Sequence, residues 1–229
     1  MGVKNLLLCA VLFLSFALSA CEANLEKDIS LNKMLNGKTA IEMATFDIEV
    51  DGCTSSDDKN EPSETVKEAQ EKVPNIFANA TYQQCYQKDK TFFASFNIPV
   101  LVSNLDYASL DKDQNFANAE IILFKVHPNS ETLAMAVKDS LAKKFSEAKD
   151  NKDFENTDLS ITFKIINDTK SVKTIKASDV FIDDLPVLNY ESKLPVNASV
   201  KMRLADVQTA YLFSDKISHN VVQFLHLDK

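Results

Sequence analysis

The sequence predicts an α+β fold, with a largely antiparallel β-sheet and two or three short helices. Over residues 92–102 apolar side chains occupy every second position, which is typical of a β-strand. Similar alternating segments recur along the chain at hairpin-like spacing. Apolar residues recur at helical spacing in only a few short segments. Strands therefore dominate the prediction, and helices are a minor component.

The first half of the chain is predicted to contain strands at 25–31, 40–50, 80–86 and 92–102 and a helix at 65–77. Residues 51–60 form a polar loop before that helix. Thr65 and Glu68 have the spacing of a capping box, which indicates where the helix begins. Pro99 has no N–H to donate to a neighbouring strand, so it marks an edge or a bulge.

The second half is predicted to contain strands at 119–126, 159–165, 172–182, 194–204 and 221–227, a helix at 130–145, and a short helix or turn at 206–215. A charged linker at 147–155 separates the second helix from the strand after it. Residues 21–229 are long enough for one sizeable domain or for two small ones. We expect a single α+β domain, or two subdomains divided near 147–157.

Residues 1–20 have the layout of a secretory signal, with Lys4 followed by an apolar segment from Leu6 to Ala20. That segment is shorter than the roughly 20 apolar residues of a membrane-spanning helix. Its end, Leu18-Ser19-Ala20-Cys21, resembles the lipobox of bacterial lipoproteins. The resemblance implies that Cys21 is acylated and becomes the new N-terminus, and acyl chains on one residue hold a soluble domain at a membrane. The alternative is ordinary secretion.

The residue after the cysteine is Glu22. By resemblance to enteric lipoprotein sorting, a residue other than Asp at this position favours the outer membrane. The expected location is therefore the cell envelope, with the domain lipid-anchored at the outer membrane and facing the periplasm.

Charge and cysteine content narrow the partners and the chemistry. Without residues 1–20 the chain has 24 basic and 33 acidic residues, a net charge of −9, which argues against nucleic acid and anionic lipid heads as partners. Of the four cysteines, Cys9 lies in the signal and Cys21 is the lipid site, which leaves Cys53 and Cys85. Export to an oxidising compartment favours a disulfide between them, stabilising by roughly 3–4 kcal/mol. The alternative, a metal pair, lacks the close Cys or His spacing of zinc sites.

The sequence offers no motif for a cofactor, a metal or a catalytic group. Without the signal, Gly37 and Gly52 are the only glycines, too few for a phosphate-binding loop, a dinucleotide fingerprint or a nucleophile elbow. His127, His219 and His226 do not form a zinc motif. Residues 111–115 begin like a calcium loop, but the glycine and glutamate positions of that loop are not matched. We therefore predict no cofactor, no metal and no catalytic residue.

Several stretches together resemble a set of uncharacterised lipoproteins encoded by phages and prophages of Gram-negative bacteria. They are Leu25–Leu35, Gly52-Cys53, Val73–Phe77, Tyr82–Tyr86, Ala94–Pro99 and Asp206-Val207. The resemblance implies a location and a setting but no known activity. We expect a non-enzymatic, lipid-anchored protein that binds another envelope component, acting in superinfection exclusion or host envelope modification. The alternative is a tethered periplasmic enzyme or enzyme inhibitor.

Overall fold

The computed structural model describes residues 22–110, 116–127, 129, 131–150 and 157–228. Within them the chain forms eleven strands, namely β1 (Glu22–Ser30), β2 (Ala40–Val50), β3 (Thr81–Lys88), β4 (Thr91–Val102), β5 (Ile121–Lys125), β6 (Thr132–Val137), β7 (Asp158–Ile166), β8 (Lys173–Ile182), β9 (Leu185–Leu194), β10 (Ser199–Leu204) and β11 (Asn220–Asp228). The helices of the same residues are α1 (Leu31–Asn36), α2 (Glu64–Ile76), α3 (Tyr107–Leu110), α4 (Asp139–Asp150) and α5 (Asp206–Leu212), with a 3₁₀ turn at Phe116–Asn118.

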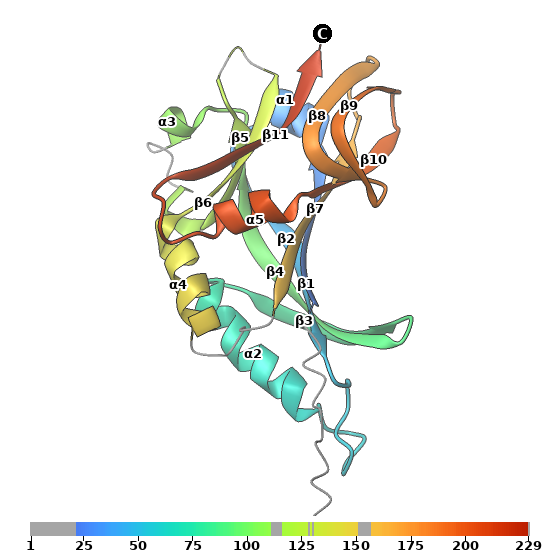
Figure 1. Cartoon of the computed structure of the whole chain (residues 1–229), viewed down its shortest axis with the longest axis vertical. Helices are drawn as coiled ribbons and strands as arrows, with labels where there is room; N and C mark the ends of the chain where they lie inside the picture. The colour runs from blue at the N-terminus through green and yellow to red at the C-terminus, as the bar shows by residue number, and fades with distance from the viewer. Residues whose placement is uncertain (1–21, 111–115, 128, 130, 151–156, 229) are drawn as a thin grey trace, which may run out of the picture.

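Nine of the described strands close into a β-barrel (Figure 1). Their order is β10-β7-β1-β2-β4-β5-β6-β11-β8, and the ring closes where Leu204 of β10 pairs with Val180 of β8. The two remaining strands lie outside the ring: β3 pairs with β4, and β9 pairs with β8. The β3–β4 and β8–β9 hairpins both extend to the right of the barrel in Figure 1, with β7 and β1 between them.

The predicted α+β fold with a largely antiparallel sheet is therefore wrong, because the chain forms a closed β-barrel with five α-helices in its described part. Alternating apolar residues look the same in an open sheet and in a barrel, so the sequence pattern could not show closure. Two pairs of barrel strands are parallel, β1–β7 and β4–β5. The β1–β7 pairing also places the residues before and after 147–157 in one sheet.

The helix predicted at 130–145 is also wrong in its first half, where Thr132–Val137 is strand β6 and α4 begins only at Asp139. Both faces of β6 are buried: Leu133, Met135 and Val137 point into the barrel, while Ala134 and Ala136 join a smaller cluster outside it. A strand buried on both faces has no polar alternation, so it resembles a helix in sequence. The segment predicted as one strand at 194–204 contains the end of β9, a turn and β10.

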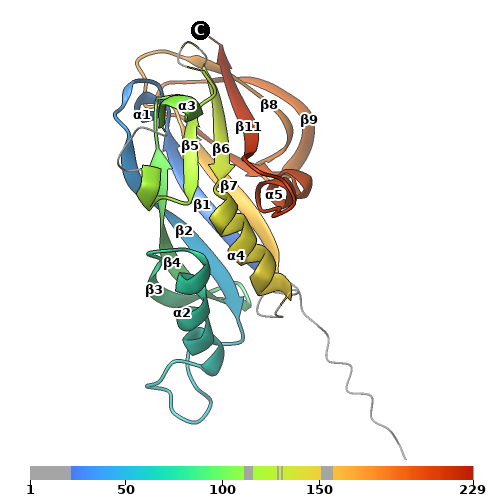
Figure 2. The same ribbon diagram turned by 90° about the vertical axis from the view of Figure 1, so that its left-hand side faces the viewer.

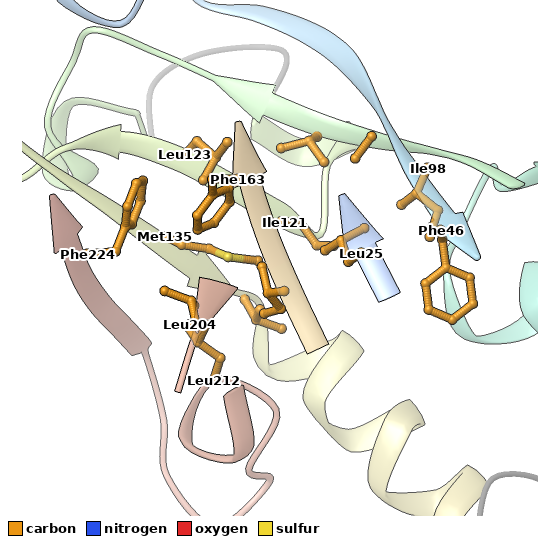
Figure 3. Packing of buried hydrophobic residues seen from close by; sticks show 14 of the residues in the cluster. Leu25, Phe46, Ile98, Ile121, Leu123, Met135, Phe163, Leu204, Leu212 and Phe224 are labelled. Carbon is orange, nitrogen blue, oxygen red and sulfur yellow. The ribbon is translucent and has the colours of Figure 1, made fainter. Parts of the chain in front are cut away.

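Apolar side chains from the barrel strands and from α2, α4 and α5 fill the interior in one cluster (Figure 3). Phe163 of β7 and Phe224 of β11 stack there, with ring centroids 4.5 Å apart. Since β7 and β11 are not neighbours in the ring, these rings meet across the barrel interior. A second cluster lies outside, where Leu110 and Ala119 cover the outer side of β4, β5 and β6.

Helix α2 lies at the lower end of the molecule, in contact with α4 (Figure 2). It begins two residues earlier than the predicted capping box: the hydroxyl of Ser63, not that of Thr65, accepts a hydrogen bond from the backbone N–H of Val66. A disulfide joins Cys53, in the loop before α2, to Cys85 on β3, with Cα atoms 5.4 Å apart. The bond therefore ties the end of β2 to the β3–β4 hairpin.

Pro99 lies where one edge of β4 passes from one partner strand to the next. Strand β3 pairs with β4 as far as Asn97, and β5 pairs with it from Val100 onwards. Pro99 therefore lies in the gap between two partner strands on one side of β4, while on the other side it pairs with Met43 of β2. Such a gap tolerates a residue without an N–H, but β4 is not an edge strand as a whole.

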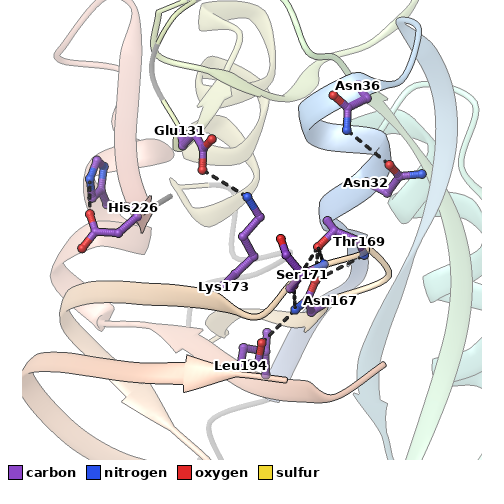
Figure 4. A network of polar contacts seen from close by, with 10 residues as sticks. Asn32, Asn36, Glu131, Asn167, Thr169, Ser171, Lys173, Leu194 and His226 are labelled. Carbon is purple, nitrogen blue, oxygen red and sulfur yellow. Dashed lines mark hydrogen bonds and ion pairs between the residues drawn. The ribbon is translucent and has the colours of Figure 1, made fainter. Parts of the chain in front are cut away.

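At the upper end, Asn167 fixes the loop between β7 and β8 (Figure 4). This side chain is fully buried, and its Nδ2 donates to the carbonyl oxygens of Ser171 (3.0 Å) and Leu194 (2.8 Å). Its Oδ1 accepts from the backbone N–H of Thr169 (3.2 Å). Buried polar groups are stabilising when they are paired in this way, so Asn167 links β7, the loop and the end of β9.

A partly buried ion pair lies on the interior side of β1 and β2. Lys27 Nζ is 2.8 Å from Glu42 Oε2, and Lys33 Nζ is 2.8 Å from Glu42 Oε1. Burial on its own would raise the pKa of Glu42, but hydrogen bonds from the two lysines outweigh it and hold that pKa below its ordinary value. A carboxylate with a lowered folded-state pKa stabilises the fold above its unfolded pKa, and this contribution is lost as the pH falls through the folded value.

We expect Glu42→Gln to lower the free energy of unfolding at pH 7 by about 1–3 kcal/mol, because Lys27 loses its charged partner while it stays buried. The difference from the wild type should begin to shrink as the pH falls below the ordinary glutamate pKa of about 4.3, and it should vanish at the more acid pH where Glu42 is neutral in the folded protein. Urea unfolding between pH 3 and 7 measures both effects. Glu191→Gln, which removes an exposed carboxylate paired with Lys176, serves as the control and should change little. A pH-independent loss in Glu42→Gln would contradict the prediction.

Candidate functional site

The described part of the chain contains a groove of about 830 Å³ beside the starts of β1 and β7. It is lined by residues on the outer face of β10, β7, β1, β2, β4 and β3, and by residues of α4, of α5 and of the segment after α5. In Figure 1 the sheet wall lies between the two projecting hairpins.

Four side chains form a line across the sheet wall, here called the polar row: Arg203, Thr162, Asn24 and Asp47. Arg203 pairs with Thr162 between β10 and β7, and Asn24 pairs with Asp47 between β1 and β2. Thr162 and Asn24 are joined by a hydrogen bond between β7 and β1. In each strand, the residues directly before and after the row residue belong to the barrel core. Successive side chains of a strand point to opposite faces, so the row lies on the outer face of the barrel.

Hydrogen bonds fix the orientation of the Asn24 amide. The hydroxyls of Ser160 and Thr162 both donate to Asn24 Oδ1, at 2.9 Å and 3.0 Å. The amide oxygen therefore has two donors, while Nδ2 is the side of the amide available to donate.

Asp47 has one paired and one unpaired carboxylate oxygen. The Tyr86 hydroxyl donates to its Oδ2 at 2.9 Å. Its Oδ1 is buried and has no hydrogen-bond partner among the described residues. Unpaired buried acceptors are uncommon in folded proteins and cost free energy. Because neighbouring atoms cover this oxygen, it could accept from a ligand only with the carboxylate turned toward the groove.

Aromatic side chains lie at both ends of the polar row. Beyond Asp47, the rings of Tyr86 and Phe93 stack with centroids 5.8 Å apart and planes at 29°. At the other end the guanidinium of Arg203 lies 3.7 Å from the centroid of the Phe181 ring. The groove thus combines polar groups with apolar ring surfaces, as ligand sites commonly do.

The cations at the β10 end of the groove have anionic partners. Arg203 Nη1 lies 3.1 Å from Asp206 Oδ1, and Lys201 Nζ lies 3.3 Å from Asp184 Oδ1. Basic and acidic residues are nearly balanced along the whole groove, with five of the former and six of the latter. The site therefore does not carry the excess of one charge that a polyanion or polycation would need.

Two of the lining residues on the helical side are aromatic. Phe145 of α4 and Phe213, which follows α5, pack with centroids 4.8 Å apart. Thr209 of α5 also lines the groove; it is 4% exposed, and its hydroxyl has no hydrogen-bond partner among the described residues. The groove therefore borders two unpaired buried polar groups, one on each wall.

Burial, together with the hydrogen bond to Asp47 and the negative charges of Asp47 and Glu26, raises the pKa of Tyr86 well above its ordinary value of 10.0. In an alkaline absorbance titration, we expect Tyr86 to stay neutral after the exposed tyrosines have ionised. The substitution Asp47→Asn should lower the titration midpoint of Tyr86. Because its folded pKa is raised, its stabilising contribution is complete below about pH 10 and declines above it. Tyr86→Phe, the control, should remove both the late ionisation and that decline. If Asp47→Asn leaves the titration midpoint of Tyr86 unchanged, the hydrogen bond between Tyr86 and Asp47 does not raise the pKa as expected.

A model of a protein family matches residues 23–225, nearly all of the described chain. The chain belongs to this family. It is described as a domain of unknown function, DUF7424. The match includes every residue of the polar row, together with Cys53 and Cys85, and begins two residues after Cys21. Comparison with curated proteins and with solved structures found no match.

Of the site residues predicted from sequence, Cys21 lies outside the described residues, and Cys53 and Cys85 do not line the groove. The calcium-like segment 111–115, which was not predicted to bind a metal, also lies outside the described residues. His226 lies beside Thr132 and Asp228, whereas the backbone N–H of His219 donates to Asp139. Among the described residues no group of three or more His, Cys, Asp or Glu side chains could hold a metal. No helix of the described chain is long and apolar enough to span a membrane.

The residues of the groove were not predicted from sequence. Asn24 and Asp47 occupy the polar positions of two predicted strands, where a solvated surface is the ordinary interpretation. The row exists only because β10, β7, β1 and β2 are neighbours in the barrel, although Asn24 and Arg203 are far apart in the chain. No local sequence signal distinguishes Asn24 or Asp47 from the other outward-facing polar residues of these strands.

Proposed function

We propose that this chain is a lipid-anchored protein of the cell envelope, attached through Cys21, that binds another envelope component in the groove without chemical turnover. The location rests on the lipobox-like Leu18-Ser19-Ala20-Cys21, and the binding role rests on the groove. Its paired charges and its unpaired Asp47 oxygen suit recognition of a polar ligand.

One observation connects the anchor to the groove. Strand β1 begins at Glu22, the residue directly after Cys21, and Glu22 lines the groove. Consecutive Cα atoms are about 3.8 Å apart, so an acylated Cys21 would have no linker between the lipid and the barrel. The groove would then be held at the membrane surface, where a component of the envelope could enter it.

Metabolic labelling with a fatty acid, followed by mass spectrometry of the N-terminal peptide, tests the anchor. We expect the wild-type protein to carry the label and to sediment with membranes, and Cys21→Ser to lose both properties. Cys9→Ser is the matched control, because Cys9 lies in the segment that is removed, and it should behave as the wild type. An unlabelled, soluble wild-type protein would refute the proposal.

The proposed outer-membrane location rests on Glu22 and is tested separately. Glu22→Asp keeps the charge but introduces the residue associated with inner-membrane retention in enteric bacteria. We expect the wild type in the outer-membrane fraction of a density gradient and Glu22→Asp in the inner-membrane fraction. An unchanged distribution would show that position 22 does not direct sorting.

The resemblance to phage and prophage lipoproteins supports a role in superinfection exclusion as the biological setting. We expect deletion of the gene to increase adsorption or infection by related phages, and the wild-type gene supplied in trans to reverse this. Equal infection of the deleted and complemented strains would remove this part of the proposal and leave the anchor untouched.

A further inference from the structure

We infer that the groove binds a neutral saccharide, with a pair of adjacent sugar hydroxyls held between Asn24 and Asp47. The inference deepens the proposed function by naming the class of envelope component that is bound. It rests on that proposal for the setting, whereas its chemistry rests on the groove alone.

The first step is the pair of unused hydrogen-bonding groups at the centre of the polar row. Asp47 Oδ1 is a buried acceptor that lacks a donor, and no described residue accepts from Asn24 Nδ2. Asn24 and Asp47 are directly opposite each other on β1 and β2. Opposite side chains in an antiparallel pair have Cβ atoms about 4.5–5.5 Å apart. Asn24 Nδ2 is therefore an unmatched donor beside Asp47, whose covered Oδ1 meets a ligand donor when the carboxylate turns toward the groove.

The second step is the ligand chemistry that matches such a pair. A hydroxyl group can donate one hydrogen bond and accept others. Two hydroxyls on neighbouring carbons can donate to Asp47 and accept from Asn24 at the same time. A phosphate group offers only acceptors and would be repelled by Asp47, while an ammonium group offers only donors and leaves Asn24 unmatched.

The third step separates a saccharide from a peptide. An extended peptide binds a sheet by adding to a free backbone edge. The polar row lies on the face of four strands that are already paired on both sides, so its recognition groups are side chains. This arrangement favours a ligand whose hydroxyl groups form hydrogen bonds with these side chains.

The fourth step is the aromatic surface next to the row. A sugar ring is polar at its rim and apolar on its C–H faces, so it packs on aromatic rings. The stacked Tyr86 and Phe93 lie beside Asp47 and line the groove, which provides such a surface. The volume of about 830 Å³ is near the upper end of small-ligand sites, about 300–1,000 Å³, and suits an oligosaccharide. The acidic and basic residues of the groove are nearly equal in number, which favours a neutral oligosaccharide over a charged one.

The test uses the full-length protein, extracted from whole cells of its host with detergent and purified. It is applied to an array of neutral and anionic oligosaccharides that includes oligomers of N-acetylglucosamine. We expect binding to neutral saccharides, with the affinity for the best one measured by calorimetry. Asn24→Ala and Asp47→Ala should each weaken it about tenfold or more. Lys164→Ala is the control. Lys164 is exposed on the same face of β7 as Thr162 but does not line the groove, so this variant should bind the saccharide with unchanged affinity.

A second measurement does not depend on the stability of the alanine variants. The chain has no tryptophan, so tyrosine dominates its near-ultraviolet absorbance. Binding should produce a tyrosine difference spectrum in the wild type that is reduced in Tyr86→Phe, which keeps the ring. The inference is overturned if no neutral saccharide binds at millimolar concentration, if only the anionic oligosaccharides bind, or if both alanine variants bind as the wild type does. Lipid labelling of Cys21 is independent of these outcomes, so the anchor and the ligand class can fail separately.

Discussion

Replacing Phe163 with alanine is expected to lower the free energy of unfolding by about 3–5 kcal/mol. Phe163 is 1% exposed, and its ring stacks on Phe224 across the barrel interior. Removing it deletes buried apolar surface and leaves a cavity that the surrounding strands cannot fill completely. Urea unfolding, followed by circular dichroism, measures the loss. Leu188→Ala is the control for a surface truncation, because Leu188 is 77% exposed, and it should change stability by no more than about 0.5 kcal/mol.

A double-mutant cycle with Phe224→Ala tests barrel closure itself. The two rings belong to strands that are not neighbours, so they touch only because the sheet closes. We expect a coupling energy of about 0.5–1.5 kcal/mol, as for other aromatic pairs. Strictly additive losses would show that the rings do not meet, which would contradict the closed barrel.

Removing the Cys53–Cys85 disulfide is expected to lower the free energy of unfolding by about 3–4 kcal/mol, because the bond closes a loop of 32 residues in the unfolded chain. The Cys53→Ala, Cys85→Ala double variant should show this loss in urea unfolding. In the folded state the β3–β4 hairpin should also become easier to cleave by proteases, since the bond is its covalent link to the loop before α2.

Reductant provides the control for the disulfide prediction. The wild-type protein should lose stability in reductant to about the level of the double variant, while the double variant itself should not respond. If the wild type is equally stable with and without reductant, and the reduced thiols are shown to be free, the bond does not contribute as expected.

Much of the secondary structure could be predicted from the sequence. The alternation at 92–102 gives β4, and the predicted strands at 40–50 and 172–182 agree closely with β2 and β8. The pattern failed where burial removed the alternation, as in β6, whose two faces pack on different clusters. It also failed at Pro195 to Ala198, where a short turn interrupts an apparently continuous series of alternating residues.

The barrel and its groove could not be predicted, because both depend on pairings between distant segments. Closure requires Leu204 to pair with Val180, and the polar row requires Asn24 to lie between Thr162 and Asp47. A single sequence records which side of a strand is apolar, but it does not record which strand lies beside it. Groove residues such as Asn24 therefore look like ordinary surface positions until the strand order is known.

Closing nine strands into a ring does not remove every free edge in the described part of the molecule. Strand β3 pairs only with β4, and strand β9 pairs only with β8, so one side of each presents backbone N–H and C=O groups to solvent. On β9 this exposed ladder runs beside Leu185 and Leu188, interrupted by Pro186. Unwanted strand addition between copies of the chain would therefore begin at these two hairpins, and Pro186 is the residue that limits it on β9.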